Sequence, residues 1–334
     1  MRNKSTELQE AKVPMPPNIE VLGEPILIQE VGMRDGLQSA GSMVSTEDKI
    51  RLLNRLSALR FHKIEVTSFV SPKAVPLLAD AEDVLKSIDR NPSTSYTALI
   101  PNIRGLERAL KTTVDEVNVV MSVSEAHNLA NLRMRCDESI EQIIQIVRES
   151  RHIKVNGTLA TAFGCPFTGQ IDEKLVIDWA QRYIDTGIDS LTIADTIGAA
   201  TPRQVNSLVS QLLKRFPEVE ITLHLHNTRG LGIANVFAGI SAGIRNFDAS
   251  FGGIGGCPYA PGATGNVCTE DLVHALRYDD FLCEVDLEAL ITITDELEGI
   301  LTRPLPGLVR QSGARDRIHP MSDNLKSLLH NSCL

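Results

Sequence analysis

Short strand-like runs and longer amphipathic stretches alternate along most of the chain, and this alternation strongly constrains the fold. The strand-like runs are rich in aliphatic and β-branched residues: Ile26–Val31, Lys63–Thr67, Ser95–Ile100, Glu116–Met121, Lys154–Ala160, Ser190–Ala194, Ile221–His226 and Asn246–Ser250. The helical stretches are Thr46–Leu59, Ala74–Ile88, Gly105–Lys111, Asp137–Ser150, Asp172–Thr186, Pro202–Phe216, Arg229–Ala242 and Val267–Leu276. Strands and helices that alternate in this way pair in parallel through right-handed crossovers.

The number of these units favours one closed barrel. Eight units within about 250 residues predict an α/β fold, a (β/α)8 TIM barrel with additional C-terminal helices. The alternative is a doubly wound open sheet, but no G-x-G-x-x-G follows the first strand, where that fold would carry a dinucleotide site. We expect a polar N-terminal arm over 1–25, a catalytic barrel over 26–300, and a subunit-contacting tail over 301–334.

Charge and hydropathy exclude several kinds of partner. The net charge of -9 and a pI near 5.4 argue against nucleic acid or an anionic membrane. No apolar run reaches the roughly 18 residues that a membrane span needs. The first 25 residues resemble neither a secretory signal nor an Arg-rich transit peptide, so we expect a cytoplasmic protein. The six cysteines form no C-x-x-C pair, which argues against a thiolate zinc site or a disulfide framework.

Two histidines stand out at the end of the seventh strand. His224 and His226 are two residues apart, so their side chains point to the same face of a strand. Their Cα atoms would lie roughly 6.6 Å apart, close enough to share one metal ion. The spacing alone is equally compatible with two unrelated histidines, and the other ligands must come from elsewhere in the chain.

Polar residues gather where the barrel strands end, which is where barrel enzymes carry their chemistry. Asp35 follows the first strand and is the natural carboxylate ligand, or else a turn residue beside Gly36. Asn266, after the eighth strand, would add an amide oxygen. Two histidines, a carboxylate and an amide suit Mg²⁺ or Mn²⁺, although zinc and Fe(II) also accept such ligands.

Other strand-end residues have two interpretations each. Arg34 would stabilise negative charge on an enolate oxygen, or form a structural ion pair with Glu30 or Glu65. Asp195 would support a neighbouring histidine, or cap the Thr196–Thr201 turn. Cys257 lies in a glycine-rich segment after the eighth strand, where it would transfer a proton if its pKa were lowered, or be incidental to a flexible loop.

Several motifs together resemble those of the 3-hydroxy-3-methylglutaryl-CoA lyase family. The resemblance runs in order from about residue 26 to about residue 300. It rests on Glu30–Gln38 (EVGMRDGLQ), Glu65–Lys73 (EVTSFVSPK), Asp195–Gly198 (DTIG), Gly252–Ala260 (GGIGGCPYA), Gly265–Asn266 and Thr269–Leu272 (TEDL).

This resemblance implies a divalent-metal-dependent lyase. It would cleave 3-hydroxy-3-methylglutaryl-CoA, or a related 3-hydroxyacyl-CoA, to acetyl-CoA and a keto acid (acetoacetate) by retro-Claisen chemistry. Members of the family also suggest a homodimer. By motif, the metal ligands are Asp35, His224, His226 and Asn266; the catalytic residues are Arg34 for the enolate, Cys257 as the proton-transferring thiol, and Glu65 and Asp195 in support, with Glu30 behind them.

The chain departs from the family pattern near the expected substrate. Met33 stands where the family usually has Pro, and Asn227-Thr228-Arg229 stand where it usually has Asp-Thr-Tyr. The run 122–131 lacks the lysines that are common there. A citramalyl-CoA-type or longer-branched substrate therefore stays open. A Claisen-condensing synthase or pyruvate aldolase is the alternative reaction, although it would not need the Cys257 loop. A barrel that binds ligands without catalysis is a third alternative.

Overall fold

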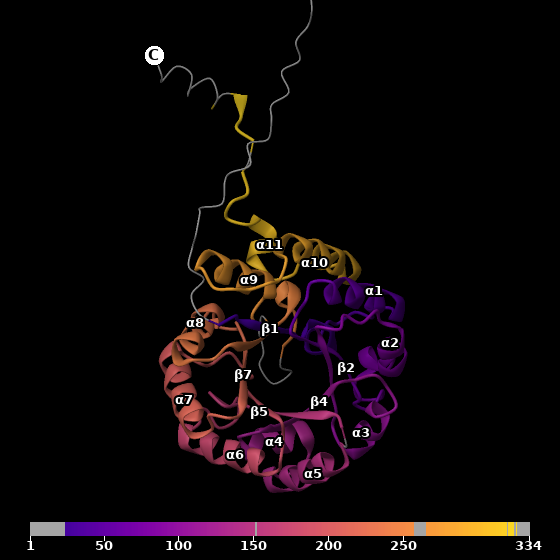
Figure 1. Cartoon of the computed structure of the whole chain (residues 1–334), viewed down its shortest axis with the longest axis vertical. Helices are drawn as coiled ribbons and strands as arrows, with labels where there is room; N and C mark the ends of the chain where they lie inside the picture. Colours follow the sequence, from indigo (N-terminus) through magenta and orange to yellow (C-terminus); the bar gives the residue numbers. More distant parts are fainter. Residues whose placement is uncertain (1–23, 151, 257–264, 319, 324, 326–334) are drawn as a thin grey trace, which may run out of the picture.

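The computed structural model describes residues 24–150, 152–256, 265–318, 320–323 and 325. Eight parallel strands close into a barrel in sequence order, with β1 pairing to both β2 and β8 (Figure 1). The strands are β1 Leu27–Glu30, β2 Lys63–Ser68, β3 Ser95–Leu99, β4 Glu116–Ser122, β5 Lys154–Ala160, β6 Ser190–Asp195, β7 Glu220–Leu225 and β8 Asn246–Ala249. The predicted (β/α)8 barrel is confirmed.

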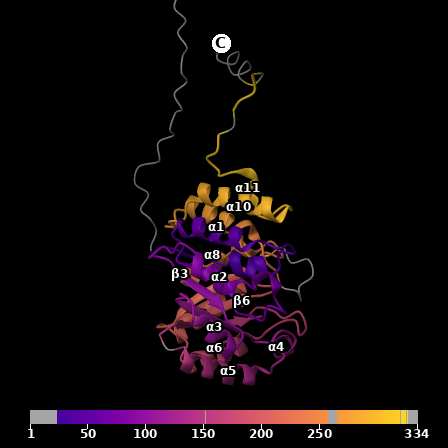
Figure 2. The same cartoon turned by 90° about the vertical axis from the view of Figure 1, so that its right-hand side faces the viewer.

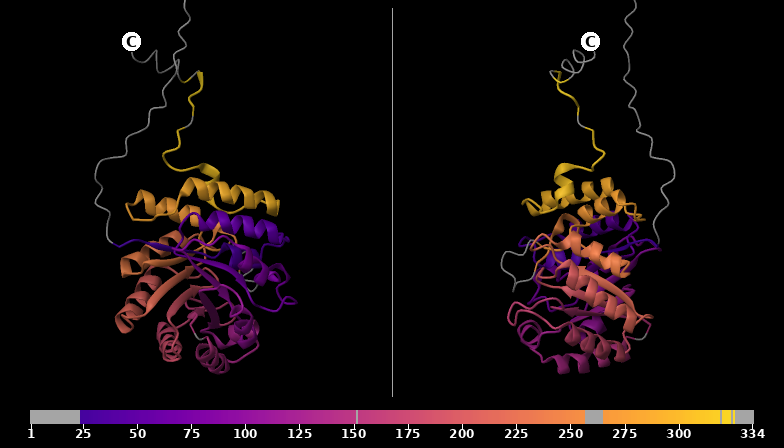
Figure 3. Two further views of the ribbon diagram at one scale, coloured as in Figure 1. Left: turned by 45° about the vertical axis from the view of Figure 1, so that its right-hand side comes forward. Right: turned by 90° about the vertical axis from the view of Figure 1, so that its left-hand side faces the viewer.

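Helices form a ring outside these strands and add a layer beyond them. They are α1 Thr46–Ser57, α2 Ala81–Ser87, α3 Ile103–Ala109, α4 Glu125–Leu132, α5 Cys136–Glu149, α6 Glu173–Asp185, α7 Pro202–Arg215, α8 Gly232–Ala242, α9 Thr269–Tyr278, α10 Leu287–Leu301 and α11 Leu308–Ser312. Three short turns are helical as well: η1 Gly32–Gly36, η2 Pro76–Leu78 and η3 Phe251–Gly253. The extra C-terminal helices lie outside α1 and α9, with α10 packed against both (Figures 2 and 3).

Local sequence accounts for where helices begin. Thr201 caps α7 by accepting a hydrogen bond from the Gln204 amide, and Pro202 occupies the first helical position, where its missing N–H costs nothing. The buried positions of this helix recur at helical spacing and cover the barrel: Val205, Leu208, Val209 and Leu212. No helix of the described residues is long and apolar enough to cross a bilayer.

One sequence prediction about helices is wrong, and one helix was not predicted. The stretch Ala74–Ile88 is not one helix, because the chain forms η2 over Pro76–Leu78 and begins α2 only at Ala81. Between them, the Asp80 carboxylate binds the buried Lys49 ammonium at 2.7 Å, so a tertiary ion pair fixes the break. Helix α4 was not expected, because it is only eight residues long and carries a weak apolar pattern.

Candidate active site

A tight turn after β1 directs Arg34 and Asp35 into the mouth of the barrel. The Val31 carbonyl accepts hydrogen bonds from the amides of Arg34, Asp35 and Gly36, at 3.1, 2.8 and 3.4 Å. The turn needs glycine because side chains crowd it. A Cβ on Gly32 would lie 2.4 Å from Phe251, and one on Gly36 would lie 2.5 Å from Ile254. The packing around this turn therefore requires both glycines, and the same motif supplies Arg34 and Asp35 to the site.

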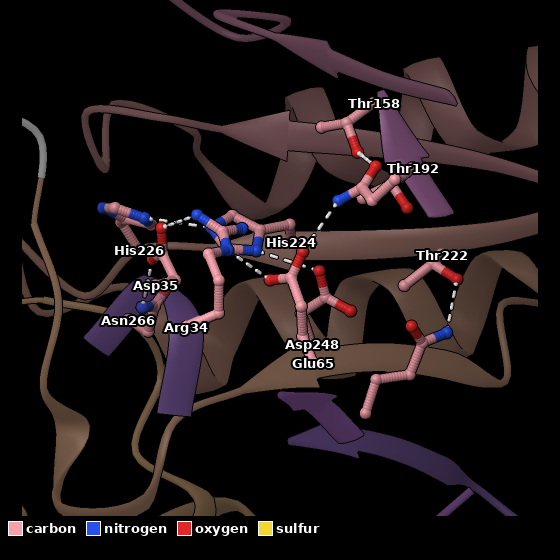
Figure 4. Close-up of polar contacts among 12 residues, drawn as sticks. Arg34, Asp35, Glu65, Thr158, Thr192, Thr222, His224, His226, Asp248 and Asn266 are labelled. Carbon is pink, nitrogen blue, oxygen red and sulfur yellow. Dashed lines mark hydrogen bonds and ion pairs between the residues drawn. The ribbon is translucent and has the colours of Figure 1, made fainter. Parts of the chain in front are cut away.

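Asp35, His224 and His226 converge at the carboxyl ends of the strands. One ligand atom from each lies within 4.8 Å of the others (Figure 4). The Nε2 atoms of the two histidines face each other at 3.1 Å. The structure therefore brings together three of the four residues that the sequence predicted as metal ligands in one small volume.

Asn266 completes this group from the segment after β8. Residues His226 and Asn266 form an isolated antiparallel bridge, and the Asn266 Nδ2 atom donates to the Asp35 carboxylate at 2.7 Å. Its Oδ1 atom is buried without a hydrogen-bond partner. The amide turns its NH₂ group toward Asp35 in this structure, and rotation of the amide would bring its unpartnered oxygen to the carboxylate instead. An amide oxygen, a carboxylate and two imidazole nitrogens are a donor set that fits a divalent cation.

The charge states of this cluster also suit metal ligands. Burial opposes ionisation of Asp35, but the charges of Arg34 and the two histidines outweigh it and lower the pKa of this carboxyl to about 2. Burial and the neighbouring His224 lower the pKa of His226 to about 4. At neutral pH, Asp35 is therefore anionic and His226 neutral, and these are the forms that bind metals.

Asp248 on β8 belongs to the site, although the sequence did not single it out. Its carboxylate lies 2.9 Å from Nδ1 of His224, and the two residues are direct partners in the β7–β8 register. Burial would lower the pKa of His224, but the hydrogen bond to Asp248 and its charge raise it. The sequence offered only a weak local signal, an acidic residue between two apolar residues of a short strand, Phe247 and Ala249.

The buried guanidinium of Arg34 is held by two carboxylates. Nε donates to Glu65 at 2.6 Å, and Nη1 donates to Asp35 at 2.7 Å. Of the two ion pairs considered from the sequence, the one with Glu65 forms. Glu30 instead accepts from the amides of Gly32 and Phe251 at 2.7 and 3.0 Å.

Asp195 ends β6 but hydrogen-bonds to its own turn. Its two carboxylate oxygens accept from the amides of Ala199 and Ala200 at 2.8 and 3.0 Å. Of the two roles considered from the sequence, support of a histidine or capping of its own turn, Asp195 shows the capping contacts. Arg229, at a position where the chain departs from the family pattern, joins the neighbouring loop. Its Nη1 donates to the carbonyls of Ile197 and Gly198 at 2.7 and 3.0 Å.

A cavity of about 440 Å³ opens over the cluster. Arg34, Asp35 and the two histidines line its polar end. The rest of its wall includes many apolar side chains, among them Val70, Val75, Ile100, Leu132 and Met134. Cys257, the expected proton-transferring thiol, lies outside the described residues.

Fold and site together define a class: a (β/α)8 barrel with a candidate divalent-metal site and a buried arginine in one cavity. A family model described as HMGL-like matches residues 25–297. The chain belongs to this family.

Similar proteins of known name agree with this assignment. A hydroxymethylglutaryl-CoA lyase of Bacillus subtilis strain 168 is 44% identical over 283 residues, covering 84% of this chain and 95% of that protein. An (R)-citramalyl-CoA lyase of Chloroflexus aurantiacus is 39% identical over 87% of this chain and 95% of its own length. The structure of an HMG-CoA lyase from Acinetobacter baumannii, in complex with coenzyme A and 3-methylmalate, superposes with a TM-score of 0.86 at 45% identity, covering 89% of this chain and 98% of that one.

Proposed function

We propose that the protein is a divalent-metal-dependent lyase that cleaves 3-hydroxy-3-methylglutaryl-CoA, or a closely related 3-hydroxyacyl-CoA. The products would be acetyl-CoA and a keto acid, acetoacetate in the first case. The observation that carries the proposal is the Asp35, His224 and His226 cluster, with its ligand atoms within 4.8 Å of one another, beside a buried arginine. The hydroxymethylglutaryl-CoA lyases among its relatives support the same reaction.

Four residues would hold the cation, Mg²⁺ or Mn²⁺. These are Asp35, His224, His226 and Asn266, and Asp248 would keep the His224 ring oriented by accepting a hydrogen bond from its Nδ1–H group. When bound, such a cation supplies Lewis acidity that favours ionisation of a substrate hydroxyl. The low pKa of Asp35 and the neutral state of His226 leave both side chains able to bind metal without first losing a proton.

The remaining chemistry would fall to Arg34 and Cys257. The substrate's 3-hydroxyl gives its proton to a solvent water, and the oxygen's electron pair forms the new ketone as the C2–C3 bond breaks. The electrons of that bond pass into the thioester and give an enolate, whose charge the Arg34 guanidinium offsets. Cys257 then donates its Sγ proton to C2, which yields acetyl-CoA. Glu65 supports this chemistry by holding Arg34 at 2.6 Å.

A citramalyl-CoA-type substrate is the alternative, because a lyase of that name is 39% identical to this chain. The departures at Asn227 and Arg229 lie in the loop that follows the His224–His226 strand end, where both side chains hydrogen-bond to backbone groups. The proposal also includes a homodimer, with residues 301–334 as a subunit contact, and a cytoplasmic location.

A coupled assay of acetyl-CoA release tests the proposal. The purified protein is stripped with a chelator and then given 3-hydroxy-3-methylglutaryl-CoA, citramalyl-CoA or a longer-branched 3-hydroxyacyl-CoA, with and without Mg²⁺ or Mn²⁺. We expect metal-dependent release, and the preferred thioester identifies the substrate. No release from any thioester, with condensation of pyruvate or another 2-oxo acid instead, would establish the synthase or aldolase alternative.

A further inference from the structure

A chain of polar side chains crosses the barrel interior beneath the cluster and ends on Glu65. Glu65 is buried between two partners on different elements. Its Oε2 atom accepts from Nε of Arg34 at 2.6 Å, and its Oε1 atom accepts from Nδ2 of Asn118 at 3.2 Å. Asn118 lies on β4 and also lines the cavity. The carboxylate that holds the arginine is therefore itself held by an amide from the opposite side.

The orientation of the Asn118 amide follows from its other partners. Its Oδ1 atom accepts from Oγ1 of Thr158 at 2.8 Å and from Nδ2 of Asn156 at 3.1 Å. A flipped amide would set two NH₂ groups against each other at Asn156 and would present an oxygen to the Glu65 carboxylate. Only the observed orientation satisfies all these groups at once, so Asn118 must offer its NH₂ to Glu65.

The next strand fixes Asn156 in turn. Its Oδ1 atom accepts from Oγ of Ser190 at 2.9 Å, and its Nδ2 atom donates to Oγ1 of Thr192 at 3.0 Å. Figure 4 shows Thr158 and Thr192 side by side on neighbouring strands, across the barrel interior from Arg34. A polar layer that spans β4, β5 and β6 thus orients one amide toward the active site.

The hydrogen bond from Asn118 to Glu65 matters because the guanidinium of Arg34 must be held in one orientation. A guanidinium has five N–H donors, and the bonds to Glu65 and Asp35 use Nε and one N–H of Nη1. These two bonds set the plane of the group, while Arg34 also lines the cavity. A hydrogen-bond donor stabilises charge that develops during a reaction most effectively when it is already oriented toward the place where that charge appears.

We propose that Asn118 is a positioning residue: by holding Glu65, it fixes the guanidinium of Arg34 toward the cavity. This inference rests on the proposed lyase function for its kinetic consequence but not for its geometry. Asn118 does not touch the reacting atoms, so its loss should lower kcat while leaving KM and metal affinity nearly unchanged.

Two variants of the same residue test the role of the donor. Asn118→Asp places a carboxylate against Glu65, with Arg34 and Asp35 the nearest other charges. We expect kcat to fall by about tenfold or more at about pH 8. As the pH falls toward about 6, the pair takes up one proton and a neutral Asp at 118 can donate to Glu65, so activity relative to wild type should recover. Asn118→Leu has no donor at any pH and should stay low throughout.

Thr222→Val is the matched control, because Thr222 is a buried threonine on a barrel strand that bonds to Gln29 and to neither Asn118 nor Asn156. We expect its kcat to stay within about twofold of wild type at every pH. If both Asn118 variants keep wild-type kcat over the whole pH range, the proposal is wrong. A parallel loss in Thr222→Val would also overturn it, since the effect would then follow from a change in any buried polar group of the barrel.

An NMR measurement separates this inference from the proposed function. The Arg34 Nε–H signal, assigned with Arg34→Lys, reports the bond to Glu65 directly. We expect its exchange with water to speed up by about tenfold or more in Asn118→Leu. An unchanged signal in both Asn118 variants overturns the inference whatever the enzyme does. A changed signal in a protein that releases no acetyl-CoA would instead show that the positioning is real and the lyase assignment wrong.

Discussion

His224 and His226 direct their Nε2 atoms at each other across 3.1 Å. Two such nitrogens can satisfy one another only if one carries the proton, yet Asp35 and an unpartnered amide oxygen lie beside them. Asp248 already binds Nδ1 of His224, which favours a proton on that nitrogen and leaves Nε2 as an acceptor. The pair is therefore arranged to share a cation more readily than a proton.

Replacing His226 by Ala should remove metal binding while the barrel persists. We expect the affinity for Mn²⁺ to fall by about a hundredfold or more, and metal-dependent cleavage to disappear with it. Titration calorimetry with Mn²⁺ on chelator-washed protein measures the affinity, and circular dichroism checks the fold. His152→Ala is the control, because His152 is exposed. A fully active His226→Ala enzyme in chelator-washed buffer would refute the metal assignment.

Asp248→Asn tests whether the carboxylate beside His224 tunes that ligand. The amide can still accept from Nδ1, but it loses the negative charge that strengthens the imidazole as a ligand. We expect metal affinity to fall by about tenfold to a hundredfold. Thr222→Val is a change on β7, the strand of His224, at a residue that bonds to Gln29, and it should leave the affinity unchanged. Equal affinities for Asp248→Asn and wild type would exclude an orienting role.

Sequence patterns predicted the barrel because each unit repeats a strong local signal, and they placed Arg34, Asp35, His224, His226 and Asn266 at one end of it. They could not decide the partner of Arg34, since Glu30 and Glu65 are both acidic residues on the neighbouring strands β1 and β2. Only the packed structure shows that Glu65 faces it while Glu30 turns toward Phe251. Asp248 was missed because its meaning depends on the β7–β8 register, which no local pattern contains.

Cys257→Ser tests the proposed proton donor, which lies outside the described residues. A serine hydroxyl is a far weaker acid than a thiol, so we expect cleavage to be abolished or nearly so while Mn²⁺ affinity is retained. Acetyl-CoA release and calorimetry measure the two effects separately. Cys283→Ser is the control, because Cys283 is a free and partly buried cysteine that packs against the hydrophobic core. Unchanged release by Cys257→Ser would mean that water or another group supplies the proton.

The buried carboxyl of Glu30 should make the stability of the fold, rather than catalysis, depend on pH. Burial raises its pKa from 4.5 to about 8, against the hydrogen bonds from Thr269, Phe251 and Gly32. The carboxyl is therefore neutral in the folded protein at pH 7, where an unfolded chain would ionise it. Its contribution to stability is fully present below about pH 4.5 and is lost as the pH rises through about 8.

Glu30→Gln removes this titration and keeps the hydrogen bonds. The amide oxygen can accept from Phe251 and Gly32, and the NH₂ can donate to Thr269, so we expect a Tm close to that of wild type at about pH 4.5. At about pH 9 the variant should be the more stable of the two, because it has no buried charge to form. Glu30→Ala, which leaves buried donors unpaired, should be about 3 kcal/mol less stable than Glu30→Gln at either pH, since neither variant titrates at this position. Calorimetry across this range measures the crossover, and Glu47→Gln, at an exposed position, controls for the change in net charge. Parallel Tm curves for wild type and Glu30→Gln would show that Glu30 is ionised in the fold.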